Sequence, residues 1–379
     1  MHKKKLLICI DWFDPAYKAG GPVRSIVNLA AHLSTQFDIY IYTSNRDLHE
    51  TKMLENITAD KWCKHVSGAN VFYASSANTG KQFVKKMLAE ISPASVYLNS
   101  VFSKKFGIDI IRAYWQVHCQ AKLVLAPRGM LKPSALATKW FKKKLFLSLA
   151  KISGIHRFIH FHVTNEAEAA EVRAVFGNSA ITVANNFPAA LLPEPAYLKK
   201  IPGYIDLILV GRIHPIKNID FILSILKDIP GSVQLDIIGV LEDAAYWQKC
   251  QTIISDLPAG KTIRLQGDMP HHLLADALSK HHLFVLPTKG ENFGHAIAEA
   301  LSMGRPVLIS DQTPWKDLNF YKAGWDCSLL SPEEFRVALT AALNWDQVTF
   351  DAGCQGALNY MRKHQANNLL VQQYQQLFN

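Results

Sequence analysis

Short apolar runs recur along the whole chain and are separated by segments with helical periodicity. In the first half they cover residues 6–10, 38–43, 71–74, 96–99, 123–126 and 158–163. In the second half they cover residues 205–210, 234–238, 262–265, 283–287 and 307–310. Runs this short and this apolar are typical of buried strands. Their alternation with helical segments predicts an α/β protein whose parallel sheets carry helices on both faces.

A proline-rich segment separates the two sets of apolar runs. Residues 186–203 contain four prolines in eighteen residues, and proline interrupts both helices and sheets. A chain of 379 residues is also too long for one ordinary core. We therefore expect two domains, residues 1–190 and 204–360, joined by a linker at about 186–203.

The composition is that of a soluble globular protein, with 49% hydrophobic and 19% charged residues. The early apolar run at residues 6–10 is too short for a signal sequence or a membrane span, so we expect a cytoplasmic protein. The six cysteines are far apart and show no metal-ligand spacing. The pairs His271-His272 and His281-His282 have no acidic cluster beside them, so no metal site is expected.

The net charge of +10 is concentrated in the first half of the chain. Residues 1–195 hold 25 Lys and Arg against 13 Asp and Glu, or +12, which leaves 16 against 18, or −2, for the rest. A basic half favours an anionic partner: a membrane surface, a phosphorylated acceptor or nucleic acid. No RNP, zinc-finger or helix-turn-helix signature is present, so nucleic acid is not expected.

Two positions in the first half are candidates for binding an anion or a sugar. Gly20 and Gly21 precede an amphipathic helix, where their missing side chains let a ligand approach the backbone; a purely structural turn is the alternative. Arg128 follows a predicted strand, at the sheet edge where open α/β proteins bind ligands. The common G-x-G-x-x-G and P-loop signatures are absent, which argues against ordinary dinucleotide and ATP sites.

The segment from Lys139 to Lys151 combines lysines with aromatic and leucine residues. A basic amphipathic helix of this kind can lie on an anionic bilayer, and a solvated basic face is the alternative. Further on, Asn165 and Glu168 have the spacing of a helix cap, which we interpret as structural.

The second half contains two cations on the loop after one predicted strand and two carboxylates on the turn and helix after another. Arg212 and Lys217 lie on one loop after a strand and offer a planar fork and a point charge, a suitable pair for a diphosphate. Glu291 and Glu299 flank the start of a helix, and Glu299 lies four residues after His295 on the same helical face. A phosphate next to a polyol would use all of these groups, because helix amides favour anions and carboxylates accept hydrogen bonds from hydroxyls. Two solvated glutamates are the alternative.

Taken together and in this order, the motifs resemble those of the retaining nucleotide-sugar glycosyltransferases of glycosyltransferase family 4, which have the GT-B fold. The resemblance rests on four elements: Gly20-Gly21, Gly211-Arg212 with Lys217, the E-x7-E element from Glu291 to Glu299, and residues 300–307. It implies two Rossmann-like domains facing across a cleft, an N-terminal one for the acceptor and a C-terminal one for the donor. It also implies that the closing helix, residues 361–379, crosses back onto the first domain.

The resemblance also implies roles for individual residues. Arg212 and Lys217 would hold the donor diphosphate, Glu291 the hydroxyls of the transferred sugar, and Glu299 the nucleotide ribose. Further donor contacts would come from residues at the diphosphate: Gly20, Gly21, Asn292, Phe293, Gly294 and His295. No D-x-D motif is present, so neither a metal nor another cofactor is expected, and the donor would be of the UDP or GDP type.

Three positions depart from the family pattern. Arg128 precedes Gly129 where many members have a histidine, so its role in orienting the sugar is an expectation only. The nucleotide-proximal loop reads Gly239-Val-Leu-Glu, and the segment after the E-x7-E helix reads Gln312-Thr-Pro-Trp. These changes leave the base of the donor open.

The sequence therefore predicts a retaining, metal-independent hexosyltransferase that moves a sugar from a nucleotide-diphosphate donor to a glycan acceptor, which we expect to be lipid-linked. Surface polysaccharide or lipid-linked glycan synthesis at the inner membrane face is the expected setting. A sugar-nucleotide epimerase of the same fold and a non-catalytic nucleotide-sugar binding protein are the alternatives.

Overall fold

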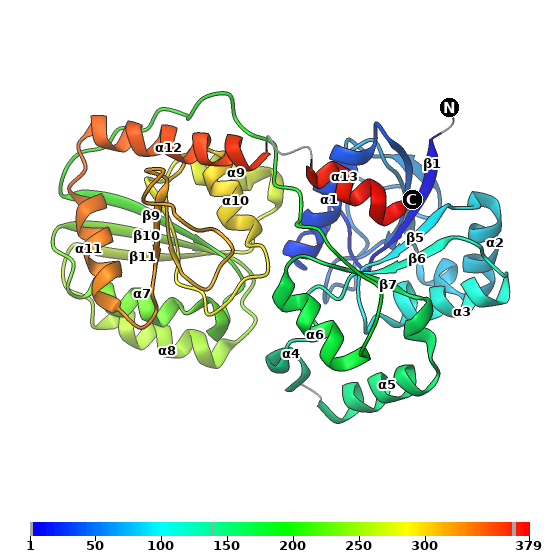
Figure 1. Ribbon diagram of the computed structural model, residues 1–379. Coiled ribbons are helices and arrows are strands. Elements are labelled where there is room, and N and C mark those ends of the chain that lie inside the picture. The colour runs from blue at the N-terminus through cyan, green and yellow to red at the C-terminus, as the bar shows by residue number, and fades with distance from the viewer. Residues whose placement is uncertain (1–2, 138–139, 366–368) are drawn as a thin grey trace. The chain divides into compact units, whose positions relative to one another are not determined.

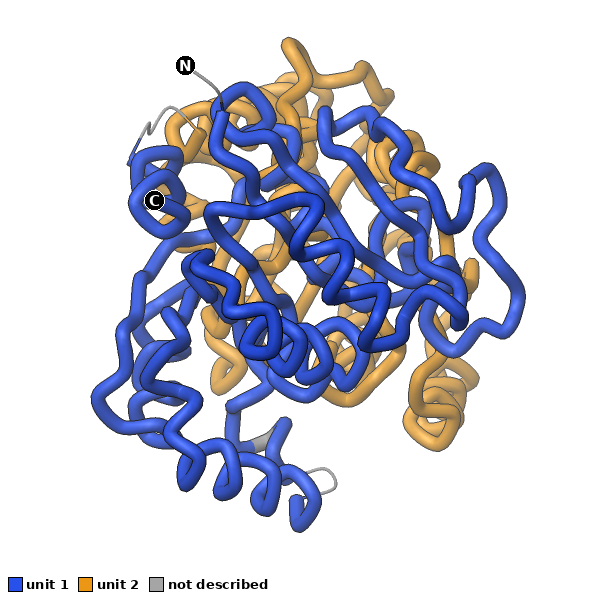
Figure 2. Tube along the Cα trace, turned by 90° about the vertical axis from the view of Figure 1, so that its right-hand side faces the viewer, with its two compact units in different colours: residues 1–187, 368–379 blue, residues 188–367 orange. Residues whose placement is uncertain are grey.

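The computed structural model describes residues 3–137, 140–365 and 369–379. The chain forms two compact units (Figure 2). Unit 1 comprises residues 1–187 and 368–379, and unit 2 comprises residues 188–367. Each unit contains its own sheet, so the two α/β repeats of the sequence form separate cores.

Unit 1 is built on an eight-stranded sheet with the strand order β3-β4-β2-β1-β5-β6-β7-β8. All neighbouring strands are parallel except β3 and β4. The strands are β1 (Lys4–Cys9), β2 (Phe37–Ser44), β3 (Trp62–Lys64), β4 (Asn70–Ala74), β5 (Ser95–Leu98), β6 (Lys122–Leu125), β7 (His160–Val163) and β8 (Ile181–Val183). The α-helices are α1 (Gly21–Leu33), α2 (Lys81–Ile91), α3 (Asp109–Gln116), α4 (Pro133–Ala137), α5 (Trp140–Ile152), α6 (Glu166–Phe176) and α13 (Leu369–Phe378).

Helices cover both faces of this sheet, as the apolar strand pattern predicts (Figure 1). Buried side chains of α1 and α13 pack on one face, together with Leu6, Ile8 and Ile10 of the β1 region. Buried side chains of α2, α3, α5 and α6 pack on the other face, together with Leu7 and Cys9. Alternate residues of one strand therefore enter two different cores, which is why the strand is apolar throughout.

Unit 2 is built on a six-stranded parallel sheet with the order β11-β10-β9-β12-β13-β14. The strands are β9 (Tyr204–Val210), β10 (Ser232–Ile238), β11 (Lys261–Gly267), β12 (Leu283–Leu286), β13 (Val307–Ser310) and β14 (Gly324–Cys327). The α-helices are α7 (Ile219–Leu226), α8 (Ala244–Ser255), α9 (His271–Ser279), α10 (His295–Ser302), α11 (Pro332–Leu343) and α12 (Gln347–Gln365).

Each apolar run identified in the sequence overlaps a strand, which confirms the predicted α/β class. The run at 158–163 starts too early, because Phe158 ends a 3-10 turn and is exposed, and β7 begins at His160. The strands β3, β8 and β14 were not predicted. They have three or four residues, lie at or next to sheet edges and are only partly buried, so they lack a continuous apolar signal.

The last helix of the chain belongs to unit 1, so the chain crosses back as the fold class predicts. Tyr374 donates a hydrogen bond to the Asn185 carbonyl (3.1 Å), and Ser95 donates one to the Phe378 carbonyl (2.7 Å). The predicted closing helix of residues 361–379 differs in its extent, because residues 361–365 continue α12 in unit 2. Buried Met361 in the unit 2 core explains why the earlier helix extends this far.

The predicted linker lies mostly in unit 2, where buried cations hold it. The Lys200 ammonium donates to four backbone carbonyls at 2.9–3.3 Å, two from the segment just before β9 and its first residue, and two from the last residue of α11 and the segment just after it. The guanidinium of Arg305, fully buried, donates to the carbonyls of Ala196 (2.8 Å) and Ser279 (2.6 Å). Carbonyl ligands of this kind compensate the cost of burying a cation. Residues 186 and 187 belong to unit 1.

Candidate functional site

The strand order of unit 2 places a ligand site between β9 and β12. These strands pair in the centre of the sheet, and the chain proceeds from β9 to β10 and β11 on one side and from β12 to β13 and β14 on the other. The loops that follow β9 and β12 therefore diverge at their carboxyl ends, which leaves the crevice where open α/β sheets bind ligands. The two loops carry Arg212, Lys217 and Glu291.

The loop after β9 is held in a fixed turn. His214 accepts a hydrogen bond from the amide of Ile216 (3.2 Å) and begins a single 3-10 turn that ends at Lys217. A Cβ on Gly211 would lie 3.1 Å from Cε of Lys217, so glycine leaves room for the lysine stem. The backbone therefore directs Lys217 back over the end of its own strand.

Backbone and side-chain hydrogen bonds join this loop to the one after β12. The Ile216 carbonyl accepts from the Lys289 amide (2.8 Å) and from the hydroxyl of Thr288 (3.0 Å), which is fully buried. The Glu291 amide in turn donates to the Gln312 carbonyl beyond β13 (3.1 Å). Three loops at the carboxyl edge of the sheet are thus tied together, and this fixes Glu291 relative to Lys217.

Lys217 and Glu291 form an ion pair. The exposed fractions of their side chains are 15% and 16%, so solvent screens the pair less than it would at the surface. The residue predicted to hold the diphosphate and the residue predicted to hold the sugar hydroxyls are therefore direct neighbours. A donor would need a cation beside a hydroxyl acceptor at the bond between phosphate and sugar.

Arg212, the other predicted cation, pairs with a residue that the sequence did not single out. Its Nη1 lies 2.6 Å from Oε2 of Glu242, and the side chains are 50% and 40% exposed. Glu242 ends the segment that replaces the usual glycine-rich loop after β10. That loop packs tightly on the loop after β9, because a Cβ on Gly239 would lie 2.0 Å from the Gly211 carbonyl oxygen.

The start of α10 depends on a glycine and two aromatic residues. Gly294 has φ 77°, and a Cβ there would lie 2.8 Å from Cδ1 of Ile297, so a larger residue is strained on both counts. Phe293 is buried, its ring centroid lies 5.3 Å from that of Trp315, and its carbonyl accepts from Trp315 Nε1 (2.6 Å). Phe293 thus shapes the turn from within the core. Trp315, at the position where the sequence departs from the family pattern, closes that core.

Glu299 is buried on α10 and has a histidine partner. Its Oε1 accepts a hydrogen bond from Nε2 of His271, 2.8 Å away at the start of α9. This contact turns one of the two adjacent histidines toward the predicted ribose position. Glu291 and Glu299 thus have different partners, and no hydrogen bond between them is observed in the part of the chain that the structure describes. His295 begins α10, and its ring centroid lies 4.6 Å from that of Phe293.

The remaining predicted site residues lie in unit 1. Gly20 is the N-cap of α1 with φ 66° and ψ −123°, a conformation that glycine adopts readily, and no atom lies within 4 Å of the Cβ that it lacks. Gly21 starts the helix, and Pro22 occupies its first turn. The open space above Gly20 is compatible with the predicted approach of a ligand to the backbone.

Arg128 lies in a left-handed turn at the end of β6 (φ 54°). Its guanidinium donates to Asn99 Oδ1 (2.9 and 3.2 Å), Asn186 Oδ1 (2.7 Å) and the Tyr97 hydroxyl (2.9 Å). These bonds join the ends of β5 and β6 to the residues that leave unit 1. Glu168, whose spacing from Asn165 predicted a cap, accepts from the Gly129 amide (2.7 Å) and so stabilises the same turn. The four bonds leave the guanidinium little capacity for a substrate.

The hydrogen-bond chain continues from Tyr97 to a buried histidine. Tyr97 donates to Nδ1 of His162 (2.6 Å), whose Nε2 donates to the Ala184 carbonyl (2.9 Å). Burial, together with the nearby Arg128 charge, lowers the pKa of His162 to about 3. Protonation would place a proton on Nδ1, where Tyr97 already donates, so the neutral form is the one that fits.

Stability should therefore fall as the pH falls from about 6.5 to about 3, because the unfolded chain takes up a proton on His162 that the folded protein excludes. The slope contributed by this group is at most about 1.4 kcal/mol per pH unit. In urea unfolding at pH 7, 5.5 and 4.5, His162→Gln should lose this part of the slope. The exposed His49→Asn variant should keep it, and an equal slope in the wild type and His162→Gln would contradict the assignment.

No group of three His, Cys, Asp or Glu residues with metal-site geometry occurs among the described residues. Nor does any helix in the described ranges have the length and apolar character needed to cross a membrane.

Comparison with known proteins agrees with the fold and with a glycosyltransferase-related second half of the chain. Residues 195–319 match a family model described as "Glycosyl transferases group 1", a segment that includes Arg212, Lys217, Glu291 and Glu299. A search of curated protein sequences finds no significant match.

Solved structures resemble the chain over almost its whole length. Sucrose-phosphate synthase from Thermosynechococcus elongatus is 17% identical, with a TM-score of 0.69 over 99% of both chains. HepE from Anabaena, in complex with UDP and glucose, is 14% identical, with a TM-score of 0.67 over 99% of this chain and 98% of that one. WaaG, a glycosyltransferase involved in lipopolysaccharide biosynthesis, is 14% identical, with a TM-score of 0.62 over 97% and 98%. The fold is thus that of the GT-B glycosyltransferases.

Proposed function

We propose that this protein is a retaining glycosyltransferase that moves a sugar from a nucleotide-diphosphate sugar to a glycan acceptor. The proposal rests on the contact between Lys217 and Glu291 at the point where the strand order of unit 2 reverses. The contact lies within the segment that matches the group 1 glycosyltransferases. A cation and a hydroxyl acceptor side by side fit the phosphate and the sugar of one donor.

The proposed chemistry depends on stabilising the leaving group. As the bond between the anomeric carbon and the diphosphate breaks, negative charge develops on the phosphate oxygens. Lys217 and Arg212, with the amides at the start of α10, would stabilise this charge without a metal. The acceptor hydroxyl would attack from the side that the diphosphate leaves, and a phosphate oxygen of the donor would take its proton. Glu291 would orient the sugar through its hydroxyls, so the protein supplies placement and charge.

The donor is proposed to be a UDP or GDP sugar. HepE was solved with UDP and glucose, and it shares the fold but only 14% of the sequence. Thermal-shift measurements with UDP, GDP, ADP and their sugars would identify the base, since a ligand at 100 times its Kd stabilises by about 2.7 kcal/mol. Mass spectrometry of the donor with and without glycan acceptors would then detect transfer. A donor that changes configuration at constant mass would indicate the epimerase, and binding without any turnover would indicate the non-catalytic protein.

Glu299→Gln should lower the rate of donor hydrolysis or transfer by about 10–100-fold. The variant loses a charged hydrogen bond to the nucleotide ribose worth about 1.5–3 kcal/mol. Initial rates at several donor concentrations measure the effect as kcat/KM. Glu333→Gln, an exposed glutamate of α11, is the matched control and should behave like the wild type. Unchanged kinetics in Glu299→Gln would remove Glu299 from the donor site.

The acceptor is proposed to be lipid-linked, with the protein working on the inner face of a membrane in surface polysaccharide or lipid-linked glycan synthesis. Helix α5 supports this, since it carries four lysines, no acidic residue and several exposed apolar side chains. Lys139, which begins the predicted segment, lies outside the described residues. Flotation with vesicles containing anionic lipid should show binding that weakens at high salt. Vesicle binding that depends on neither the lipid charge nor the salt concentration would contradict this proposed membrane contact.

A further inference from the structure

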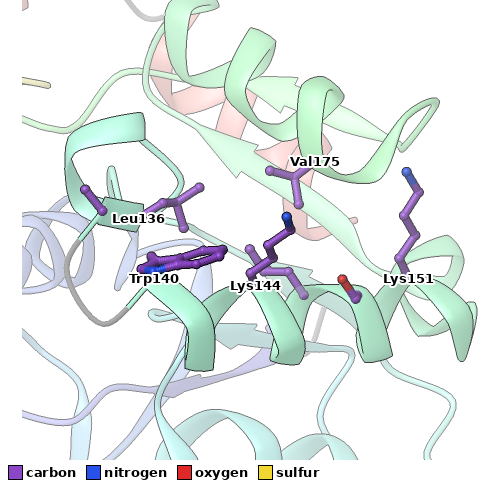
Figure 3. Close-up of a pocket in the computed structure, with 8 residues that line it drawn as sticks. Leu136, Trp140, Lys144, Lys151 and Val175 are labelled. Carbon is purple, nitrogen blue, oxygen red and sulfur yellow. The ribbon is translucent and has the colours of Figure 1, made fainter.

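A cavity of about 440 Å³ lies beside α5 in unit 1 (Figure 3). Its wall is mostly apolar and is formed by Leu136 of α4, Trp140 and Leu147 of α5, and Val175 of α6. The volume falls in the range of about 300–1,000 Å³ that small-molecule sites occupy. None of the roles proposed for the donor site uses this cavity.

Two lysines border the cavity. Lys144 and Lys151 extend from α5 toward the helix that carries Val175 (Figure 3). They are seven residues apart, so about 10 Å of helix separates their Cα atoms. The ammonium of Lys144 lies 5.4 Å from the ring centroid of Trp140, in the geometry of a cation–π contact. An apolar wall with cations along one side is complementary to an anionic amphiphile.

The cavity is distinct from the outward face of α5. Phe141, Leu145, Leu149 and Ile152 follow each other at helical spacing and are each more than half exposed. They form a stripe on the side of the helix away from the unit 1 core; we refer to these four residues as the apolar stripe. The cavity opens on the neighbouring face, where Trp140, Lys144 and Lys151 lie. A bilayer could cover the apolar stripe, whereas the cavity, at about 440 Å³, has the volume of a site for one small molecule.

We propose that this cavity binds the hydrocarbon chain of a phosphate-bearing lipid, which is the lipid part of the acceptor, and that Lys144 and Lys151 bind its phosphate. The inference rests on the proposed transfer to a lipid-linked glycan. Apolar side chains take up the chain by the hydrophobic effect, and the lysines pair with the phosphate at the water boundary.

The position of the cavity favours the acceptor lipid over a lipid of the surrounding bilayer. If the apolar stripe rests on a bilayer, it would contact many bilayer lipids, whereas a bounded cavity is suited to binding one molecule. Helix α4, which contributes Leu136, begins five residues after Arg128 at the carboxyl edge of the sheet, where α/β units bind their ligands.

The test uses the full-length protein and radiolabelled farnesyl monophosphate, a soluble isoprenoid phosphate, in equilibrium dialysis below its micelle concentration. Ser148 lines the cavity and is exposed, so Ser148→Phe should fill the cavity, and Ser148→Ala is the matched control. The wild type and Ser148→Ala should bind saturably, with Ser148→Phe weaker by at least about tenfold. Replacing Lys144 and Lys151 together by Gln should weaken binding similarly, whereas Lys142→Gln, on α5 but outside the cavity, should not.

Several results would overturn the proposal. Equal binding by Ser148→Phe and Ser148→Ala would show that the cavity is not the site. If farnesol bound as tightly as farnesyl monophosphate, the lysines would not be binding the phosphate. The variant with both Leu145→Gln and Leu149→Gln should no longer bind vesicles but should still bind farnesyl monophosphate. Loss of that ligand would place it on the apolar stripe instead.

Donor measurements on the same proteins separate this inference from the proposed function. Ser148→Phe should keep the wild-type thermal shift with the nucleotide sugar and the wild-type rate of donor hydrolysis, while lipid binding falls. Such a result supports the cavity. If no nucleotide sugar bound to any of these proteins but farnesyl monophosphate did, the lipid site would stand and the proposed glycosyltransferase would fail.

Discussion

Lys217→Ala is expected to reduce kcat/KM for the nucleotide-sugar donor by about 10²–10³-fold, the loss seen when one donor group that stabilises developing charge is removed. The upper part of the range applies because the ammonium is mostly buried and lies between two loops that hydrogen bonds hold together. A cation fixed in advance at the leaving group acts on the transition state more than on the bound donor. The loss should therefore appear mainly in kcat.

The control for this variant is on the adjoining loop. Lys289 is an exposed lysine whose amide, not its ammonium, makes the loop contact, so Lys289→Ala should keep both the fold and the rate. Both proteins would be compared by thermal melting before initial rates are measured. A folded Lys217→Ala protein with the wild-type kcat would show that this lysine does not stabilise the leaving group.

The effect of Glu291 can be separated from that of Lys217 by combining the two substitutions. Removing Glu291 alone leaves Lys217 without its carboxylate partner and removes the proposed contact to sugar hydroxyls. Because the two side chains touch, their effects should not add, and the double variant measures the coupling directly. Additive losses would mean that the ion pair has no part in the reaction.

The strands and the overall class were predictable because they depend on local apolar runs. Every run but one entered a core between helices; the exception, residues 262–265, forms the edge strand β11, none of whose residues is buried. The crossing of the last helix was implied by the resemblance to the GT-B fold. The end of α12 was not predictable, since Met361 is held by packing against residues distant in the sequence. The edge strand β3 was not predicted because none of its residues is buried, so it has no continuous apolar run.

The positions of the candidate site residues followed from the sequence, but their partners did not. The spacing placed Lys217 after one predicted strand and Glu291 after another, and the structure shows that these strands, β9 and β12, are neighbours. The spacing gave no indication that His271 would bond to Glu299, since the two residues lie 28 positions apart and meet through the packing of α9 and α10. The histidine pair itself was a signal that could have prompted the search. Trp315 was recognised in the sequence as a departure from the family pattern. In the structure its indole NH donates a hydrogen bond to the Phe293 carbonyl at the start of α10.

Arg128 shows how a sequence position can suggest more than one role. The carboxyl end of β6 is a ligand-binding position, and a guanidinium there can bind an anion. In the structure its donors are occupied by Asn99, Asn186 and Tyr97, which connect two strand ends to the chain leaving unit 1. Its part in catalysis stays a prediction, and any such part would act through the position of that segment.

Arg212 and Lys217, the two cations proposed to hold the diphosphate, each pair with a carboxylate in the structure. A diphosphate must therefore compete with Glu242 for Arg212 and with Glu291 for Lys217. The first exchange should cost little, because half-exposed ion pairs are worth about 0–1 kcal/mol. The second involves a more buried pair, and Glu291 can turn to the sugar hydroxyls once phosphate replaces it at the lysine.

Arg212→Ala should lower kcat/KM for the donor by about 10²-fold, toward the lower end of the range for a charge-stabilising group, because water screens its half-exposed side chain. Initial rates over a range of donor concentrations measure this loss. Arg212→Lys should recover only part of the rate, since an ammonium cannot bind two phosphate oxygens in the manner of a planar guanidinium.

Glu242→Gln tests whether Arg212 binds the diphosphate or only forms a structural ion pair, because the variant breaks that ion pair and keeps the arginine. If Arg212 binds the diphosphate, this variant should bind the nucleoside diphosphate as tightly as the wild type or up to about fivefold more tightly, since the pair to be displaced is worth at most about 1 kcal/mol. If the ion pair serves only to hold the loops after β9 and β10 together, both substitutions should lower stability and rate alike. Opposite effects of Arg212→Ala and Glu242→Gln on nucleotide affinity would therefore establish the arginine as a donor ligand.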